Sequence, residues 1–218
     1  MADETTTGIL RIGSKAPDFK TKTTHGELQF SDWAKDSWVI FFSHPADFTP
    51  VCSTEFNEFA KRADDFKQRN CKLLGLSIDS VYSHLAWVRS IEQMFDVKVP
   101  FPVVADLDTK VAQLYGMIHP GASETVTVRA VYFIDPSQVV RAIIYYPLNV
   151  GRNMDEILRT LDALQTATKY GVACPANWRP GDKVIVPAPV TYDAMNKRLG
   201  EAATLEQKEW WFSKKALT

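Results

Sequence analysis

The sequence predicts an α/β fold in which helices cover a mixed β-sheet, followed by an irregular α+β extension at the C-terminus. Two observations support this prediction. Between residues 38 and 115, short apolar segments typical of buried strands alternate with amphipathic helical segments, which indicates a parallel sheet. Two segments of alternating polarity then flank a tight turn at residues 135–138, which adds an antiparallel hairpin.

The first elements are assigned from their patterns. Residues 20–30 alternate around His25 and Gly26, which predicts a pair of short edge strands. Residues 38–42 form an unbroken apolar run, typical of a strand buried on both faces. The next helix is predicted from an apolar stripe with helical spacing. The stripe contains Cys52, Phe56, Phe59, Ala63 and Phe66.

The remaining elements complete a layered fold. Further strands are predicted at residues 72–79, 101–106, 126–135 and 138–146. Further helices are predicted at residues 83–95, 109–115 and 153–169. In the 83–95 helix the apolar positions are Leu85, Val88, Ile91 and Phe95. A parallel βαβ unit joined to a hairpin and a final helix is typical of a thioredoxin-like sandwich, in which ligands bind at the carboxyl ends of the strands.

The chain changes character near Cys174, where prolines and glycines become frequent and apolar periodicity weakens. A turn at residues 179–182 precedes a predicted strand at residues 183–186. We therefore expect a thioredoxin-like domain at residues 8–170 and an extension at residues 171–218. The extension is too short for a core of its own, so we expect it to pack on the main domain or on a second subunit.

Composition and charge exclude several classes of protein. The 218 residues are 45% hydrophobic and 23% charged, as in an ordinary globular protein. The formal net charge is −1, so no strong field recruits nucleic acid. No segment approaches the roughly 20 apolar residues of a membrane span, and residues 1–6 lack the regions of a signal peptide. We expect a cytoplasmic protein without a nucleic-acid partner or stable membrane insertion.

The cysteines and histidines indicate neither a disulfide framework nor a metal site. The three cysteines are an odd number without a C-x-x-C pair. The four histidines lack ligand spacing, although folding could bring some of them together. We expect reduced thiols and no metal. Cys71 is expected to be inert core, and His84 to be a helix-start residue rather than a catalyst.

Cys52 is the strongest candidate for a reactive residue. It follows the strand at residues 38–42 and lies in the first turn of the predicted helix, where unpaired N–H groups and the helix dipole favour the thiolate. Pro50 suits the first helical position. If the turn is already helical at Thr49, its hydroxyl lies beside the sulfur. The alternative is a cysteine that packs as a small hydrophobe.

Four other residues could complete a site around Cys52. Arg129 stands in an otherwise apolar strand, where an unpaired guanidinium would be costly. It could pair with Glu55, face the thiolate, or do both. His44 could line the mouth of the site or pack in the core, and we favour the lining role. Pro45 pins the loop that leaves the strand.

A short motif then links the chain to a known family. Pro45, Thr49 and Cys52 form the pattern P-x-x-x-T-x-x-C, in which the chain resembles the peroxiredoxins. The segment S-H-P-A-D-F-T-P-V-C at residues 43–52 is similar to their one-Cys, type-six branch. The similarity covers about residues 8–190. It includes residues 76–81, 84–87, 116–117, 146–147, 151–153, 155–159 and 175–178.

The resemblance implies a thiol-dependent peroxidase that reduces hydrogen peroxide and organic hydroperoxides. In that family Cys52 would be the peroxidatic nucleophile and would become a sulfenic acid. Thr49, Pro45 and Arg129 would hold the peroxide and activate the sulfur, and Glu55 would steady the arginine. The resemblance also implies no cofactor, an external reductant of the glutathione or thioredoxin type, and a homodimer or higher oligomer.

The sequence departs from relatives at two places. Cys174 lies in A-C-P, where type-six relatives usually carry Thr-Pro and two-Cys relatives carry a resolving cysteine, so a resolving role stays open. Some type-six relatives are phospholipases with G-D-S-W-G, whereas residues 35–39 read K-D-S-W-V. Ser31 and Ser137 stand where a histidine and an aspartate would be needed, so we expect no lipase.

A second class of function also fits a reactive Cys52. A redox sensor or a holdase-like oligomer would use the same thiolate only as a switch. Measured consumption of peroxide separates these possibilities, because a sensor turns over poorly.

Overall fold

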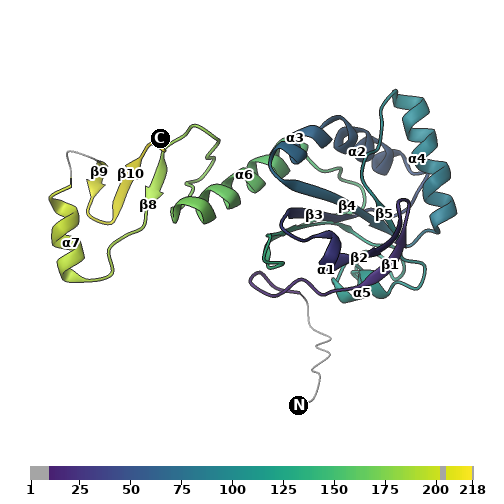
Figure 1. Ribbon diagram of the computed structural model, residues 1–218, viewed down its shortest axis with the longest axis horizontal. Coiled ribbons are helices and arrows are strands. Elements are labelled where there is room, and N and C mark those ends of the chain that lie inside the picture. The colour runs from purple at the N-terminus through teal and green to yellow at the C-terminus, as the bar shows by residue number, and fades with distance from the viewer. Residues whose placement is uncertain (1–9, 202–204, 218) are drawn as a thin grey trace, which may run out of the picture. The chain divides into compact units, whose positions relative to one another are not determined.

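A seven-stranded mixed sheet organises the part of the chain that ends at Met154 (Figure 1). The computed structural model describes residues 10–201 and 205–217. Contacts within these residues group into two units, divided between Met154 and Asp155. Each unit is described separately below.

The strand order in the large sheet is β2-β1-β5-β4-β3-β6-β7. The strands are β1 Lys20–Thr23, β2 Gly26–Gln29, β3 Trp38–Ser43, β4 Cys71–Ser77, β5 Val103–Ala105, β6 Arg129–Ile134 and β7 Val140–Tyr146. Strand β4 pairs in parallel with both β3 and β5. The pairs β1–β2 and β6–β7 are antiparallel. The predicted parallel unit, edge strands and hairpin are therefore confirmed.

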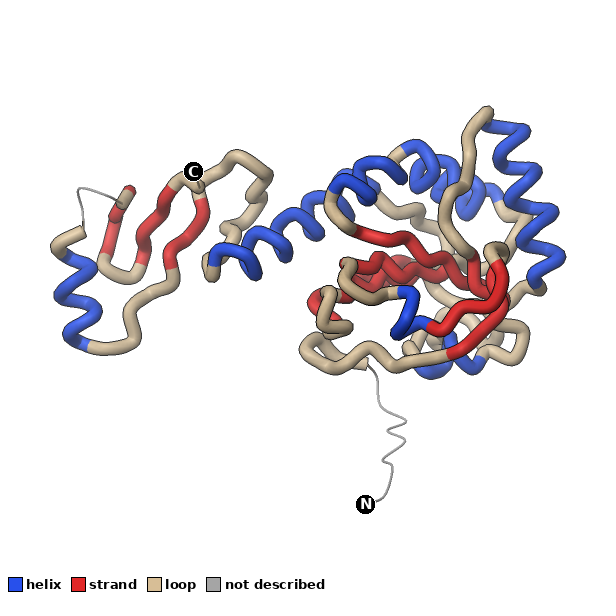
Figure 2. Tube along the Cα trace, in the orientation of Figure 1, coloured by secondary structure: helices blue, strands red, loops and turns tan. Residues whose placement is uncertain are grey.

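Helices cover both faces of this sheet. They are α1 Phe30–Trp33, α2 Pro50–Lys61, α3 Ala63–Gln68, α4 Val81–Phe95 and α5 Lys110–Leu114. Figures 1 and 2 show α2, α3 and α4 on one side and α1 and α5 on the other. Neighbouring residues of β3 serve opposite layers, because Phe41 packs on Tyr115 while Phe42 stacks on Phe59 of α2. The predicted helices on a mixed sheet are confirmed.

Two details of the predicted helices were wrong. The stripe from Cys52 to Phe66 is divided between α2 and α3, because Arg62 adopts φ −100° and ψ 8° and interrupts the helix. In α4, Leu85 is exposed, and the buried face instead contains His84, Trp87 and Ile91. A buried histidine with hydrogen-bond partners is invisible to a pattern of hydrophobicity alone.

The second unit has more regular structure than its sequence suggested. It contains α6 Met154–Tyr170, α7 Tyr192–Leu199 and the strands β8 Val184–Val186, β9 Glu206–Glu209 and β10 Phe212–Lys215. The strands form a small sheet in the order β8-β10-β9. Val172, Trp178 and Val184 form a small buried cluster within this unit. The predicted domain start at residue 8 lies outside the described residues, and the boundary after residue 170 stays a prediction.

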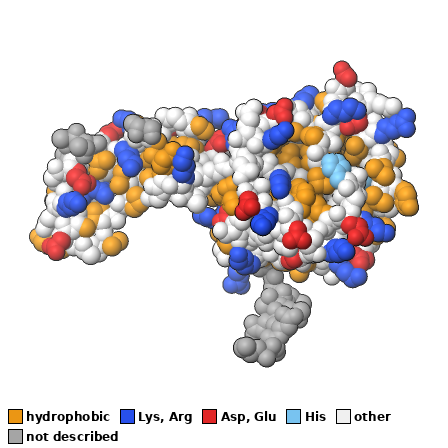
Figure 3. Space-filling model, in the orientation of Figure 1, with side chains coloured by type: hydrophobic (Ala, Val, Ile, Leu, Met, Phe, Trp, Pro, Cys, Tyr) orange, Lys and Arg blue, Asp and Glu red, His pale blue; other side chains and the backbone are white. Residues whose placement is uncertain are grey.

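The surface carries charges of both signs. Figure 3 shows lysine and arginine side chains interspersed with aspartate and glutamate over the visible face. This distribution agrees with the formal net charge of −1. Within the described ranges, no helix has both the length and the hydrophobicity needed to cross a bilayer.

Candidate active site

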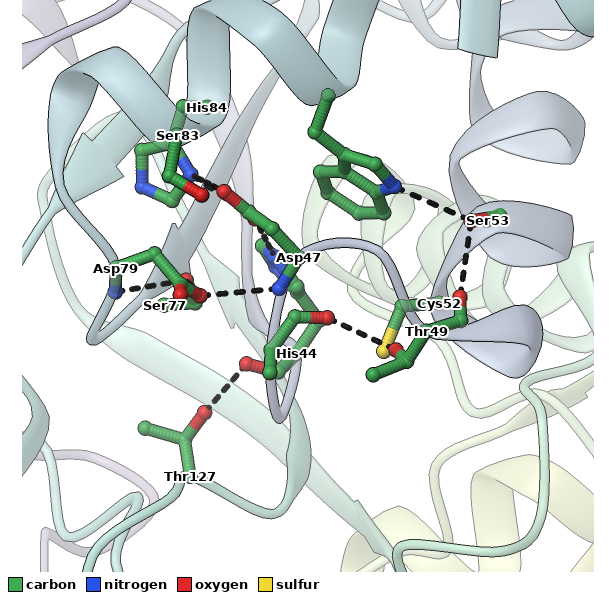
Figure 4. Close-up of polar contacts among 12 residues, drawn as sticks. His44, Asp47, Thr49, Cys52, Ser53, Ser77, Asp79, Ser83, His84 and Thr127 are labelled. Carbon is green, nitrogen blue, oxygen red and sulfur yellow. Dashed lines mark hydrogen bonds and ion pairs between the residues drawn. The ribbon is translucent and has the colours of Figure 1, made fainter. Parts of the chain in front are cut away.

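Cys52 lies in the first turn of α2, as predicted. The helix begins at Pro50, whose ring supplies the φ of a first helical residue and whose missing N–H costs no hydrogen bond there. The Cys52 side chain is buried, with an exposed fraction of 0%. The residues between β3 and α2 form a loop at the carboxyl end of β3, and Figure 4 shows this loop leading from His44 through Asp47 to Thr49 and Cys52.

Thr49 caps the helix rather than entering it. Its backbone is extended, with φ −107° and ψ 143°, so the condition for placing its hydroxyl by helical spacing is not met. The hydroxyl donates to the Ala46 carbonyl oxygen at 2.8 Å. The Thr49 carbonyl accepts from the Ser53 backbone N–H at 3.0 Å and from the Ser53 hydroxyl at 2.9 Å. Thr49 is thus fixed between the loop and the first turn of the helix.

Arg129 makes both of the contacts that its sequence position suggested. It lies in β6 with an exposed fraction of 2%. Its Nη1 donates to the Cys52 sulfur at 3.2 Å and to Glu55 Oε2 at 2.7 Å. Its Nε and Nη2 donate to the Leu148 carbonyl oxygen at 3.0 and 2.7 Å. The structure therefore brings Cys52 and Glu55 of α2 together with Arg129 of the distant strand β6.

A second arginine completes this cluster and was not singled out from the sequence. Arg152 donates from Nε to Glu55 Oε1 at 2.9 Å and from Nη2 to Glu55 Oε2 at 2.6 Å. It also reaches the carbonyl oxygens of Ser43 and Ala130 and stacks on the Phe42 ring. Burial alone would raise the pKa of Glu55, but Arg152 and then Arg129 outweigh burial and lower it. In the sequence, Arg152 stands between a glycine and a predicted helix, within the segment 151–153 that carries part of the family resemblance, but no role was assigned to it.

The loop before the helix is strained. Phe48 has φ +55°, a left-handed conformation that costs a residue with a Cβ on the order of 1–3 kcal/mol. Asp47 directly before it is buried and makes three anchoring contacts. Its carboxylate faces His44 at 3.0 Å and His84 at 2.8 Å, and its N–H donates to Asp79 at 3.0 Å. The contacts of Asp47 therefore keep Phe48 in its strained conformation.

His44 packs in the core, and its lining role stays a prediction. Its side chain is fully buried, and its ring stacks on Trp87 with centroids 4.9 Å apart. Burial lowers the pKa of His44, which keeps the ring neutral. His84, predicted as a helix-start residue, lies in the first turn of α4 and is also buried.

Among the described residues, His44, Asp47 and His84 form the group of side chains that could hold a metal ion. Their ligand atoms all lie within 4.8 Å of one another. The hydrogen bonds of His44 and His84 lower the pKa of Asp47 well below its usual value, although burial alone would raise it. The nitrogen-to-oxygen distances of 2.8 and 3.0 Å are those of direct hydrogen bonds. The expectation of no metal stays a prediction.

The other two cysteines lie in different surroundings. Cys71 begins β4 and is buried, and burial raises the pKa of its thiol well above the usual value, as expected for inert core. Cys174 is half-buried in the second unit, and its thiol donates to the Ala163 carbonyl oxygen at 3.5 Å. Burial also raises the pKa of Cys174.

Comparison with known proteins places this arrangement in a family. Residues 12–143 match the model of the AhpC/TSA family, and residues 163–202 match that of the C-terminal domain of 1-Cys peroxiredoxin. The chain belongs to the peroxiredoxins, in their one-Cys branch. Among curated proteins it is similar to a peroxiredoxin of Aquifex aeolicus, with 51% identity over 215 residues that cover 94% of this chain and 96% of that protein. A peroxiredoxin of Archaeoglobus fulgidus is 47% identical over 212 residues, covering 94% and 98%.

Solved structures agree with this family. A yeast mitochondrial 1-Cys peroxiredoxin has a TM-score of 0.85 and 42% identity, and the match covers 96% of this chain and 100% of that one. A cysteine-to-serine mutant of peroxiredoxin 6 of Arenicola marina has a TM-score of 0.86 and 34% identity, covering 96% and 99%. The fold and the thiol-dependent reduction of peroxide are therefore those of the peroxiredoxin family.

Proposed function

We propose that Cys52 is the residue that attacks the peroxide. The thiolate sulfur bonds to one peroxide oxygen, the O–O bond breaks, and the other oxygen takes a proton and leaves as water or alcohol. Cys52 is oxidised to a sulfenic acid and the peroxide is reduced by two electrons. The observation that carries this proposal is Arg129 Nη1, a positive donor at 3.2 Å from a sulfur that sits at a helix start.

The surrounding residues receive distinct roles in this proposal. Arg129 and the N–H groups at the start of α2 stabilise negative charge as the O–O bond breaks. Thr49 and Pro45 shape the loop that receives the peroxide. Glu55 holds Arg129 in place across 2.7 Å. Hydrogen peroxide and organic hydroperoxides are the proposed substrates.

The sulfenic acid must be reduced before the next cycle. We propose an external thiol reductant of the glutathione or thioredoxin type, the two systems that the description of the yeast 1-Cys structure names for that protein. Two thiols supply the two electrons, giving a disulfide, water and free Cys52. Cys174 is not needed in this scheme, and its raised pKa makes it a weak attacking thiol at neutral pH.

A homodimer or a higher oligomer is also proposed. Strand β7 lies at the edge of the large sheet, and Tyr145 on it has an exposed fraction of 37%. An open strand edge with apolar residues is suited to pairing with a second copy. Analytical ultracentrifugation is expected to give at least twice the chain mass of 24.6 kDa. The cytoplasm is the proposed compartment, supported by three free thiols.

The decisive experiment measures peroxide consumption with glutathione or thioredoxin as reductant. Wild type and Cys174→Ser are expected to turn over alike, and Cys52→Ser is expected to be inactive. Mass spectrometry after peroxide and dimedone is expected to find the adduct on Cys52. A disulfide between Cys52 and Cys174 would instead assign a resolving role to Cys174. If Cys52 reacts once with peroxide but the protein does not consume further peroxide, it would be a redox sensor.

A further inference from the structure

His44, Asp47 and His84 form a buried cluster that the proposed reaction does not use. The exposed fractions of their side chains are 0%, 1% and 0%. Asp47 accepts from His44 Nε2 at 3.0 Å and from His84 Nδ1 at 2.8 Å (Figure 4). His44 and Asp47 belong to the loop before α2, whereas His84 belongs to α4. The cluster therefore ties the loop that leads to Cys52 to a separate helix.

The partners of His84 determine where its protons lie. Its Nε2 is 3.0 Å from the Val104 carbonyl oxygen, which can only accept, so Nε2 carries a hydrogen. Its Nδ1 faces both oxygens of Asp47, at 2.8 and 3.0 Å. An ionised carboxylate also only accepts, so Nδ1 donates as well. His84 is thus held by hydrogen bonds at both ring nitrogens.

His44 is bonded differently. Its Nε2 donates to Asp47, while within the described residues its buried Nδ1 has no hydrogen-bond partner. Asp47 therefore holds both rings. His84 engages both carboxylate oxygens, at 2.8 and 3.0 Å, whereas His44 engages Oδ1 alone, which makes the Asp47–His84 pair the stronger of the two contacts.

The position of Asp47 gives this pair a consequence for the active site. The next residue, Phe48, is strained at φ +55°, and the one after it, Thr49, caps the helix of Cys52. A strained residue keeps its conformation only where its surroundings fix it. The Asp47 N–H adds a bond to Asp79, which in turn accepts from the Ser77 hydroxyl at 2.7 Å. Asp47 is thus anchored to α4 and to the end of β4.

We infer that Asp47 and His84 are positioning residues for the Cys52 site, which fix Pro45 and Thr49 without touching the peroxide. This inference rests on the proposed role of Cys52. Loss of the Asp47–His84 bond would let the strained loop relax and shift Thr49, the N-cap residue of the helix that carries Cys52. A displacement of about 1 Å in a catalytic group can slow a reaction on the order of 100-fold.

A metal ion is the competing explanation of the same three side chains. The Val104 carbonyl would then orient His84, as carbonyls do for ligating histidines. The direct hydrogen-bond distances favour a proton between each ring and the carboxylate. Metal content of the purified full-length protein separates the two explanations.

Two substitutions of His84 separate its two bonds. In His84→Asn the amide nitrogen can take the place of Nδ1 and keep the bond to Asp47. In His84→Gln it can take the place of Nε2 and keep the bond to Val104. We expect stopped-flow reaction with hydrogen peroxide to be slowed about tenfold to 100-fold in His84→Gln and much less in His84→Asn. His25→Gln, in an exposed turn, is the control and should react like wild type.

Each outcome bears on the inference. Equal rates in the two His84 variants, or rates that follow only their melting temperatures, would overturn it. A stoichiometric metal ion would overturn the hydrogen-bonded cluster, as would a ¹⁵N NMR spectrum that shows one bare nitrogen on His84. Asp47→Asn gives the same test if His84→Gln fails to fold. If the wild-type protein does not react with peroxide, the proposed function itself is refuted. If wild type reacts and His84→Gln reacts at the same rate, only the positioning role is refuted.

Discussion

Arg129 Nη1 lies 3.2 Å from the Cys52 sulfur, so a positive charge on β6 faces the thiol at the start of α2. The same guanidinium is held from two other sides, by Glu55 at 2.7 Å and by the Leu148 carbonyl at 2.7 Å. Three fixed contacts leave the guanidinium little freedom to turn. A donor that is already oriented toward developing charge stabilises a transition state without reorganising.

The first prediction concerns the shape of this arginine. Arg129→Lys keeps a positive charge but cannot bond Cys52, Glu55 and the Leu148 carbonyl at once, because an ammonium lacks the planar fork. We expect the rate constant for reaction with hydrogen peroxide to fall about 100-fold. Stopped-flow measurement checks this. Arg141→Lys, on the partner strand of the hairpin, is the control and should react normally. A normal rate in Arg129→Lys would show that charge alone suffices.

The second prediction concerns stability. Glu55→Gln removes the negative charge that Arg129 and Arg152 share, leaving two buried guanidinium groups without it. Removal of one partner of a buried ion pair costs about 3–5 kcal/mol in free energy of unfolding. Urea denaturation should show a loss in that range. Glu58→Gln, in the same helix, breaks only a half-exposed pair with Lys61 and should cost less than about 1 kcal/mol. Similar losses in both variants would contradict the prediction.

The third prediction concerns the stability of the folded protein at acid pH. The pKa values of Glu55 and Asp47 are lowered in the folded protein, whereas in the unfolded chain both groups titrate near pH 4. Their stabilising contribution is therefore complete above about pH 5 and is lost as pH falls through the folded pKa values. The free energy of unfolding should decrease steadily below about pH 5.

A comparison isolates the contribution of one carboxylate to this acid dependence. Glu55→Gln has no group to titrate at that position, so its free energy of unfolding should decrease less steeply with acid than that of wild type. Denaturant titrations at several pH values measure both slopes. Identical slopes would mean that Glu55 contributes nothing to the acid dependence.

Much of the fold could be predicted because its central strands, such as β3 and β6, are buried on both faces. All six residues of β3, Trp38–Ser43, are buried, and the unbroken apolar run at residues 38–42 predicts such a strand directly. The small second sheet could not be predicted in the same way. Its strands β9 and β10 consist of Glu206–Glu209 and Phe212–Lys215, which are mostly polar, so no apolar alternation marks them.

The residues of the site also divide into those that a local sequence pattern marks and those that it does not. Cys52 was singled out by its place at a predicted helix start, whereas the helical placement expected for Thr49 was not met, because Thr49 is the extended N-cap residue. Arg129 was found because a lone charge in an apolar strand needs a partner. Arg152 and the pairing of Asp47 with His84 depend on contacts between residues far apart in the chain, and no local pattern marks them. The burial of His44 could not be predicted for the same reason, since its position is fixed by Asp47 and Trp87.

The last prediction separates the three thiols by their reactivity toward iodoacetamide. Burial raises the pKa of both Cys71 and Cys174, so few of these thiols are ionised at pH 7, and Cys71 is also closed off in β4. Cys52 is equally buried, but it lies at a helix start and its sulfur accepts a hydrogen bond from Arg129 Nη1 at 3.2 Å. Mass spectrometry should therefore find Cys52 labelled first, then Cys174, and Cys71 only after denaturation. Prior oxidation by one equivalent of peroxide should abolish labelling of Cys52 alone, and early labelling of Cys71 would contradict this order.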